Sequence, residues 1–290
     1  MSLTSLIKRS ATGLIYVALI VSSLMLFEGL AYPFLCMLFC ALGILEFHHL
    51  YYPSAQEANA DGGWLIRIID VVVGVVMCSF VPSAFIVGRF GGNIMMSVFG
   101  CGSTLIILFL IRMIAQLYLP GVNALRSLSC SLMAYVYVGL PLAISTLLYG
   151  FFSASIVLVM FVMIWLNDTG AFCVGSMIGR RRLFERISPK KSWEGFWGGM
   201  LFCVASAFLV KYCFGPWSTG LPLWQLCVMG FIVSIVATWG DLVESLIKRT
   251  VGVKDSGKLL PGHGGILDRI DSLLLTAPAV FVLLSLFFFL

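Results

Sequence analysis

Long apolar stretches constrain this sequence more than any other feature. A helix needs about 20 apolar residues to cross roughly 30 Å of hydrocarbon. We place about nine such segments along the chain, at residues 11–31, 32–50, 68–88, 94–117, 127–149, 152–178, 196–214, 222–247 and 272–290. Charged residues make up only 11% of the sequence, against about 25% in soluble domains. The sequence therefore predicts an all-α, polytopic integral membrane protein whose surroundings are the lipid bilayer.

The basic residues predict the orientation of these helices, because cytoplasmic loops collect Lys and Arg. With a cytoplasmic N-terminus and nine crossings, 16 of the 18 basic residues fall on the cytoplasmic side, and only Arg89 and Lys211 fall outside. In a bacterium the membrane would be the cytoplasmic (inner) one. We interpret residues 1–150 as N-terminal transmembrane helices that anchor and scaffold, and residues 151–290 as a catalytic transmembrane region with cytoplasmic polar loops. Together they form one membrane domain.

The nine cysteines are scattered, form no CxxC pair and do not cluster with the three histidines. This distribution predicts neither a zinc site nor a disulfide framework.

Ionisable residues gather instead in two stretches of the second half. Eight of the 13 acidic residues lie between Asp168 and Asp271. The two stretches run from residue 165 to 199 and from residue 240 to 272, on the same predicted side. Polar groups are costly in a membrane, so their positions indicate functional sites.

The first stretch begins with Asp168, near the inner end of an otherwise apolar helix. A carboxylate there needs a cation, a partner or a water-filled cavity. A basic loop follows, with Arg180, Arg181 and Arg182 ahead of the run Ser-Pro-Lys-Lys-Ser-Trp-Glu-Gly at residues 188–195. Attraction to anionic lipid would explain the charge alone. The placement of Pro, Trp and Gly is more specific and favours an anion site.

The second stretch starts with Asp241, Glu244, Ser245 and Lys248, spaced to project from one helix face. A Glu244–Lys248 pair is the simple interpretation, but four polar residues near hydrocarbon favour a shared cavity. A loop with four glycines between residues 257 and 265 follows. Glycines let backbone amides approach a ligand, and nearby Lys and Arg residues suit phosphates. Neither a P-loop nor a dinucleotide-binding GxGxxG motif is present.

Two residues of this stretch, His263 and Asp271, also have simpler structural interpretations. His263 has no second histidine nearby, so a loop hydrogen bond or a phosphate contact is favoured over metal ligation. Asp271 sits near the start of the last predicted helix, where a carboxylate also stabilises the positive helix end.

The residues from Ser245 to Asp271 resemble the full signature of the phosphatidate cytidylyltransferase (CDP-diacylglycerol synthase) family. The matching residues are Ser245-Leu246-Ile247-Lys248-Arg249, Lys254-Asp255, Gly257, Leu260-Pro261, His263-Gly264-Gly265-Ile266 and Asp268-Arg269-Ile270-Asp271. The Asp168 stretch and residues 188–195 are similar to the family's upstream motif, except that Phe172 stands where the family often has Tyr. The N-terminal helices match only in hydropathy.

The resemblance implies that CTP and phosphatidate give CDP-diacylglycerol and diphosphate, in phospholipid biosynthesis, with an active site on the cytoplasmic side. It implies Mg²⁺, with a second cation left open, and Asp241 and Asp268 as metal ligands. The other catalytic candidates are Lys248, Arg249, Lys254, Asp255, His263, Arg269 and Asp271. The substrate-binding candidates are Asp168, Ser188, Lys190, Lys191, Trp193, Glu194, Glu244, Ser245, Gly264 and Gly265. No nucleic-acid partner is expected, and a homodimer is left open.

Two alternatives share some of these features. A proton- or cation-coupled transporter could use Asp168, Asp241 and Glu244 as an intramembrane relay, but it predicts inverted repeats and charges near the bilayer midplane. The sequence has no such repeats, and its charges gather on one side. A different lipid-linked phosphotransferase that uses CTP would share the electrostatics and differ only in its acceptor.

Overall fold

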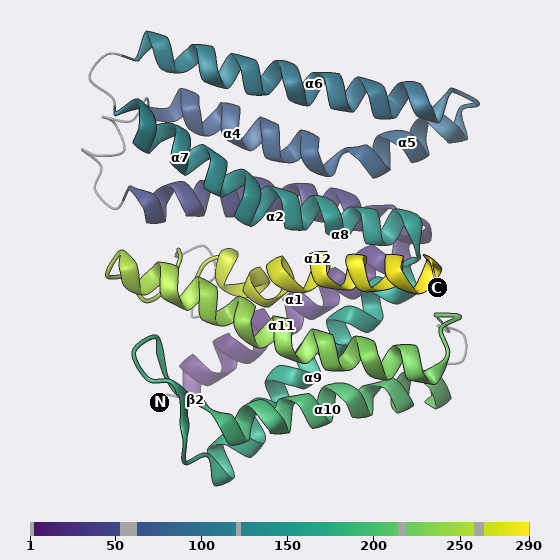
Figure 1. Ribbon diagram of the computed structural model, residues 1–290, viewed down its shortest axis with the longest axis vertical. Coiled ribbons are helices and arrows are strands. Elements are labelled where there is room, and N and C mark those ends of the chain that lie inside the picture. Colours follow the sequence, from purple (N-terminus) through teal and green to yellow (C-terminus); the bar gives the residue numbers. More distant parts are fainter. Residues whose placement is uncertain (1–2, 53–62, 120–122, 214–218, 258–263, 290) are drawn as a thin grey trace. The chain divides into compact units, whose positions relative to one another are not determined.

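The computed structural model describes residues 3–52, 63–119, 123–213, 219–257 and 264–289, most of them in helices (Figure 1). The α-helices are α1 (Leu3–Met25), α2 (Ala31–Tyr51), α4 (Gly63–Cys78), α5 (Phe80–Arg89), α6 (Ile94–Ala115), α7 (Ala124–Ala134), α8 (Leu140–Phe151), α9 (Ala154–Ile178), α10 (Trp193–Cys213), α11 (Leu223–Thr250) and α12 (Leu267–Phe289). Short turns of 3-10 helix at Leu26–Gly29 and Gln116–Tyr118 and a π-helical turn at Tyr135–Gly139 adjoin them. The predicted all-α class is confirmed.

Seven helices in the described part of the chain are long and apolar enough to cross a membrane, or eight if α4 and α5 form one bent span. The polytopic membrane class is thus confirmed, while the count of nine and the orientation stay predictions. In α1 the apolar stretch at Thr12–Met25 is shorter than a full span.

The predicted helix at residues 68–88 is two helices in the structure, with a bend of 52° between α4 and α5. Pro82 lies in the first turn of α5 and has no N–H to donate to the carbonyl one turn earlier. The helix therefore breaks before Pro82, and the Ser79 hydroxyl bonds the Val76 carbonyl at 2.8 Å.

The predicted loop after α9 contains a short β-hairpin. Strand β1 (Arg182–Phe184) pairs antiparallel with β2 (Ser188–Ser192), with a register shift between Arg182 and Phe184. The Trp193 N–H donates to the Arg181 carbonyl at 2.9 Å and closes the hairpin onto the start of α10. Helix α10 consequently begins at Trp193, not near residue 196.

The chain divides into two compact units. The first comprises Met1–Gly150 and Asp255–Asp268, and the second comprises Phe151–Lys254 and Arg269–Leu290. In the first unit, α2 packs on α4, and both α4 and α5 pack on α6 (Figure 1). In the second, α10 packs against both α9 and α11, which also contact each other.

A buried cluster of charged and hydroxyl groups ties the helices of the first unit together. Asp70 of α4 is fully buried, and its carboxylate lies 2.8 Å from His48 Nε2 of α2 and 3.3 Å from Arg112 Nε of α6. Ser131 of α7 and Tyr135 donate hydroxyl hydrogen bonds to the same carboxylate. Buried charges are tolerated when paired and hydrogen-bonded in this way, so the cluster holds four helices in one arrangement.

Small residues let α9 and α10 of the second unit approach each other closely. A Cβ added at Gly195 would lie 2.9 Å from the Ala171 carbonyl oxygen, and one at Gly199 would lie 2.8 Å from the Asn167 side-chain oxygen. Close backbone approach of this kind is a common way to pack helices in membranes. It places the start of α10, and with it the end of β2, beside the C-terminal turns of α9.

Candidate active site

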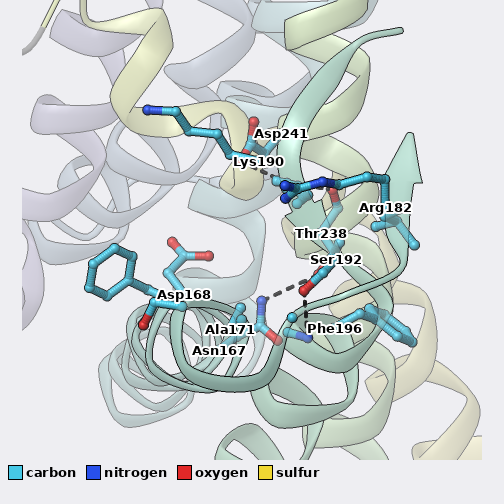
Figure 2. A pocket seen from close by; sticks show the side chains of 16 residues that line it. Asn167, Asp168, Ala171, Arg182, Lys190, Ser192, Phe196, Thr238 and Asp241 are labelled. Carbon is cyan, nitrogen blue, oxygen red and sulfur yellow. Dashed lines mark hydrogen bonds and ion pairs between the residues drawn. The ribbon is translucent and has the colours of Figure 1, made fainter. Parts of the chain in front are cut away.

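A cavity of about 570 Å³ opens in the second unit, among α9, the hairpin, α10 and α11. This volume is in the usual range for a small-molecule site. Figure 2 shows Asp168 of α9 and Asp241 of α11 at the cavity, with Arg182 and Lys190 on the hairpin side. The other lining residues are Asn167, Ala171, Phe172, Gly175, Ser176, Gly179, Leu183, Lys191, Ser192, Gly195, Phe196 and Thr238.

Residues from both polar stretches of the sequence meet in this cavity. Lys191 Nζ lies 2.8 Å from Asp241 Oδ2 and 3.3 Å from the Thr238 carbonyl oxygen. Ser245 donates to Asp241 Oδ1 at 3.2 Å. Both members of the ion pair remain partly exposed, at 25% for the Lys191 side chain and 35% for that of Asp241. The pair can therefore reach a ligand in the cavity.

Asn167 also lines the cavity, although it was not among the residues predicted from the sequence. It is 2% exposed, accepts from Ser234 Oγ at 2.7 Å and donates to Thr238 Oγ1 at 3.4 Å. These bonds connect α9 to α11 one residue before Asp168. They therefore fix the position of Asp168 on α9 relative to that of Asp241 on α11.

The hairpin is shaped by side chains that were predicted to bind substrate. The Glu194 carboxylate accepts from the Arg180 and Arg181 backbone amides at 3.1 and 3.2 Å. Two neighbouring contacts order the start of α10.

 The Ser192 hydroxyl accepts from the Gly195 N–H at 3.1 Å, and the Trp193 ring packs edge-on against Phe196 at 5.9 Å. Glu194 and Trp193 therefore shape the loop, and neither they nor Ser188 line the cavity.

The polar face of α11 divides into two pairs. Lys248 Nζ lies 2.5 Å from Glu244 Oε2, and Glu244 is fully buried. Asp241 and Ser245 form the other pair, of which Asp241 lines the cavity. Arg249 bonds the Ile187 carbonyl at 3.4 Å and so connects the end of α11 to the hairpin turn.

Acidic groups concentrate around Asp241. Asp168 and Asp271 both interact electrostatically with Asp241, and Lys191 offsets part of their repulsion. Arg269 contributes positive charge near Asp168. Among the residues that the structure describes, no group of three or more His, Cys, Asp or Glu side chains is placed to hold a metal ion.

The first unit contains the middle part of the signature, Asp255–Asp268. Asp268 Oδ2 accepts hydrogen bonds from the Gly265 N–H at 2.8 Å, the Ser256 N–H at 2.9 Å and the Ser256 hydroxyl at 3.0 Å. Gly264 has a φ of 80°, a conformation that favours glycine. Asp268 thus holds two parts of the loop together at the start of α12.

The remaining predicted residues have simpler positions. Lys254 of the second unit and Asp255 of the first are exposed, while Arg269 and Asp271 in the first turns of α12 are half-buried. Asp271 accepts from the Ser272 N–H at 2.5 Å. His263 lies outside the described residues. Asp241 and Asp268 belong to different units, so their joint role as metal ligands stays a prediction.

Sequence reasoning also missed Glu46 of α2, whose carboxylate bonds the loop. The signal was present, because Glu46 is the only acidic residue of the apolar segment 32–50. The rule that identified Asp168 applies to it equally.

These features define a class: a helical, polytopic membrane protein with a charged cavity between its helices. The chain belongs to the cytidylyltransferase family, whose sequence profile matches residues 7–287. The predicted family is thereby confirmed.

Curated relatives named phosphatidate cytidylyltransferase are similar to one part of the chain. The proteins from Staphylococcus saprophyticus and Staphylococcus haemolyticus are each 45% identical over 128 residues, which are 44% of this chain and 48% of the relative. One from Staphylococcus aureus is 46% identical over the same length, with the same shares. The match spans about half the length of these relatives.

Proposed function

We propose that this protein transfers a cytidylyl group from CTP to phosphatidate and forms CDP-diacylglycerol and diphosphate. The observation that carries the proposal is the meeting of both polar stretches of the sequence in one cavity, through the Lys191–Asp241 ion pair. Membership of the cytidylyltransferase family supports the nucleotide, and the names of the relatives support the acceptor.

The chemistry of the proposed transfer determines what the cavity has to supply. An oxygen of the phosphatidate phosphate attacks the α-phosphorus of CTP, and the bond from that phosphorus to the β-phosphate oxygen breaks. Diphosphate leaves with the electron pair. The nucleophile is already an anion, so the enzyme need not supply a Ser, Cys or His nucleophile. Its task is to position two anions and to offset their charge.

Basic side chains on the hairpin can perform that task. Arg182, Lys190 and Lys191 line the cavity, and Lys191 is held in place by Asp241 and the Thr238 carbonyl. Charge-assisted contacts to phosphate oxygens are among the stronger hydrogen bonds in proteins. A lipid substrate also suits a chain whose described part contains seven or eight candidate membrane spans, since the acyl chains of the lipid can remain in the bilayer.

Mg²⁺ is part of this proposal, with Asp241 as a ligand and Asp268 as the second ligand implied by the signature. The donor chemistry fits, because carboxylate and phosphate oxygens are the ligands that Mg²⁺ prefers. The mutual repulsion of Asp168, Asp241 and Asp271 is what a cation would relieve. When bound, the ion would supply positive charge for the triphosphate. A second cation and a homodimer are further questions for experiment.

The test is an assay of purified protein in detergent with cytosine-labelled CTP, Mg²⁺ and phosphatidate. We expect label in the lipid extract together with an equal amount of diphosphate. Diacylglycerol, which lacks the phosphate nucleophile, is the matched control and should give no product. If label is transferred to another lipid phosphate but not to phosphatidate, the proposed acceptor is wrong. If no lipid acceptor becomes labelled, the proposed cytidylyl transfer is wrong.

A further inference from the structure

We propose that Glu46 of α2 is a positioning residue for the two ends of the glycine-rich loop, at residues 256–257 and 265–267, and that it sets the affinity of the enzyme for CTP with Mg²⁺. The inference rests on the proposed function, because the loop acts on the triphosphate only in that reaction. It gives a helix outside the signature a direct part in shaping the signature segment of its own unit.

The Glu46 carboxylate binds the chain where the loop becomes helix α12. Oε1 accepts from the Ile266 N–H and Oε2 from the Leu267 N–H, both at 2.9 Å. The first amides of a helix have no acceptor within the helix, and a negative charge there is favourable. Glu46 therefore caps α12 with a side chain from another helix.

The same carboxylate contacts the chain before the loop as well as after it. Ser256 Oγ lies 3.1 Å from Glu46 Oε2 and 3.0 Å from Asp268 Oδ2, and Ser256 is 1% exposed. The buried Ser256 hydroxyl therefore connects Glu46 to the predicted metal ligand Asp268. A displacement of Glu46 would reach Asp268 through this hydroxyl and through the backbone at residues 266–268.

At two glycines of the signature, the backbone passes very close to the Glu46 carboxylate. A Cβ at Gly257 would lie 2.7 Å from Glu46 Oε1, and a Cβ at Gly265 would overlap both Glu46 Oε2 and the Ser256 hydroxyl. Only glycine at these positions lets the backbone come this close without a shift. The two glycines thus allow the backbone to approach Glu46, in addition to any approach of the backbone to a ligand.

Glu46→Gln tests the idea at constant side-chain size. The amide offers one oxygen, and its NH₂ group would face a backbone N–H, so one cap is lost and a donor meets a donor. We expect the KM for CTP at saturating Mg²⁺ to rise about tenfold, as for a lost charge-assisted contact. The KM for phosphatidate should stay essentially unchanged. Glu46→Asp keeps the charge on a shorter side chain and should recover part of the loss.

Asp70→Asn is the matched control, because it also removes a buried carboxylate from the first unit but leaves the Glu46 contacts intact. It should lower the thermal unfolding midpoint without changing the KM for CTP. An unchanged KM for CTP in Glu46→Gln would overturn the proposal. So would loss of folded protein in both Glu46 variants, since Glu46 would then serve stability alone.

A second readout separates this inference from the proposed reaction. CTP with Mg²⁺ should raise the thermal unfolding midpoint of the wild-type protein, and should do so less in Glu46→Gln at the same concentrations. This measurement does not depend on the lipid acceptor. If the wild type makes no CDP-diacylglycerol but shows this difference, the proposed function fails and the role of Glu46 stands. Equal stabilisation of the two proteins, or none in the wild type, overturns the inference.

Discussion

Lys191 Nζ and Asp241 Oδ2 lie 2.8 Å apart, in an ion pair that joins the hairpin to α11 at the cavity. The two residues are 50 positions apart, and each comes from a different polar stretch of the sequence. The pair leaves both side chains partly exposed, so a phosphate or a cation can exchange with either partner. Asp241 is therefore the residue whose charge should matter most to turnover.

Replacement of Asp241 by Asn keeps the size and one oxygen of the side chain but removes its charge. We expect Asp241→Asn to fold and to lose nearly all turnover, because Mg²⁺ bound with CTP would lose a charged ligand. Asp268→Asn should have the same effect on turnover. The measurement is the initial rate of lipid labelling at saturating CTP across a Mg²⁺ titration. Exposed Asp255→Asn is the control and should be milder. Near-normal activity of either variant with an unchanged Mg²⁺ requirement would contradict the assignment.

Basic residues near the loop are predicted to contact the triphosphate. Lys254→Ala and Arg269→Ala should each remove a contact of about 1.5–3 kcal/mol, which lowers kcat/KM about ten- to a hundredfold. Arg89→Ala, at an exposed position near the end of α5, should be nearly silent. Steady-state rates with varied CTP provide the comparison. Equal losses in all three variants would mean that the assay reports folding instead of substrate contact.

Gly199 should not tolerate a methyl group. The added Cβ would lie 2.8 Å from both the backbone and side-chain oxygens of Asn167, so α9 and α10 would have to move apart. We expect Gly199→Ala to cost about 1–3 kcal/mol of stability and to lower activity, because Asn167 adjoins Asp168. Gly100→Ala is the control, since its Cβ meets nothing within 4 Å and alanine favours a helix. Thermal unfolding in detergent measures both, and equal midpoints would refute the close packing.

The predicted orientation can be tested with single cysteines in a cysteine-depleted variant. Ser192 and Ser256 are poor labelling sites because they are 4% and 1% exposed. Thr250 at the end of α11 and Phe90 after α5 are exposed. With a cytoplasmic N-terminus, Phe90→Cys should react with a membrane-impermeant thiol reagent on intact cells, and Thr250→Cys should react only after lysis. The reverse pattern would invert the topology.

Hydropathy predicted the helices well because a membrane span must be long and apolar. It could not predict where the helices break. The bend at Ser79 depends on a missing N–H at Pro82, and the hairpin is too short and too basic to show an alternating strand pattern. Helix starts were placed several residues late at α10 and α12, since the polar residues at their first turns resemble a loop.

The site residues that belong to a sequence motif were predictable, whereas those whose position depends on helix packing were less so. Asp168, Lys190, Lys191 and Asp241 line one cavity, as two polar stretches on the same predicted side suggested. Asn167 was missed because an amide beside an aspartate gives no separate signal. Asp70 and Arg112 were detectable as single charges in apolar segments, but only the structure shows that they neutralise each other.

The loop of the signature belongs with the first unit, although most of the second half belongs with the other. Consider chimeras that join the first 150 residues of one relative to the remainder of another. Such chimeras would exchange the anchoring helices together with the carboxylate that accepts hydrogen bonds from the start of α12. Such hybrids should keep the full affinity for CTP only when the donor of the N-terminal half carries a carboxylate at the position of Glu46. Swapping at residue 150 thus also exchanges the carboxylate that holds the signature loop, and libraries of recombined halves would select for that single matched position.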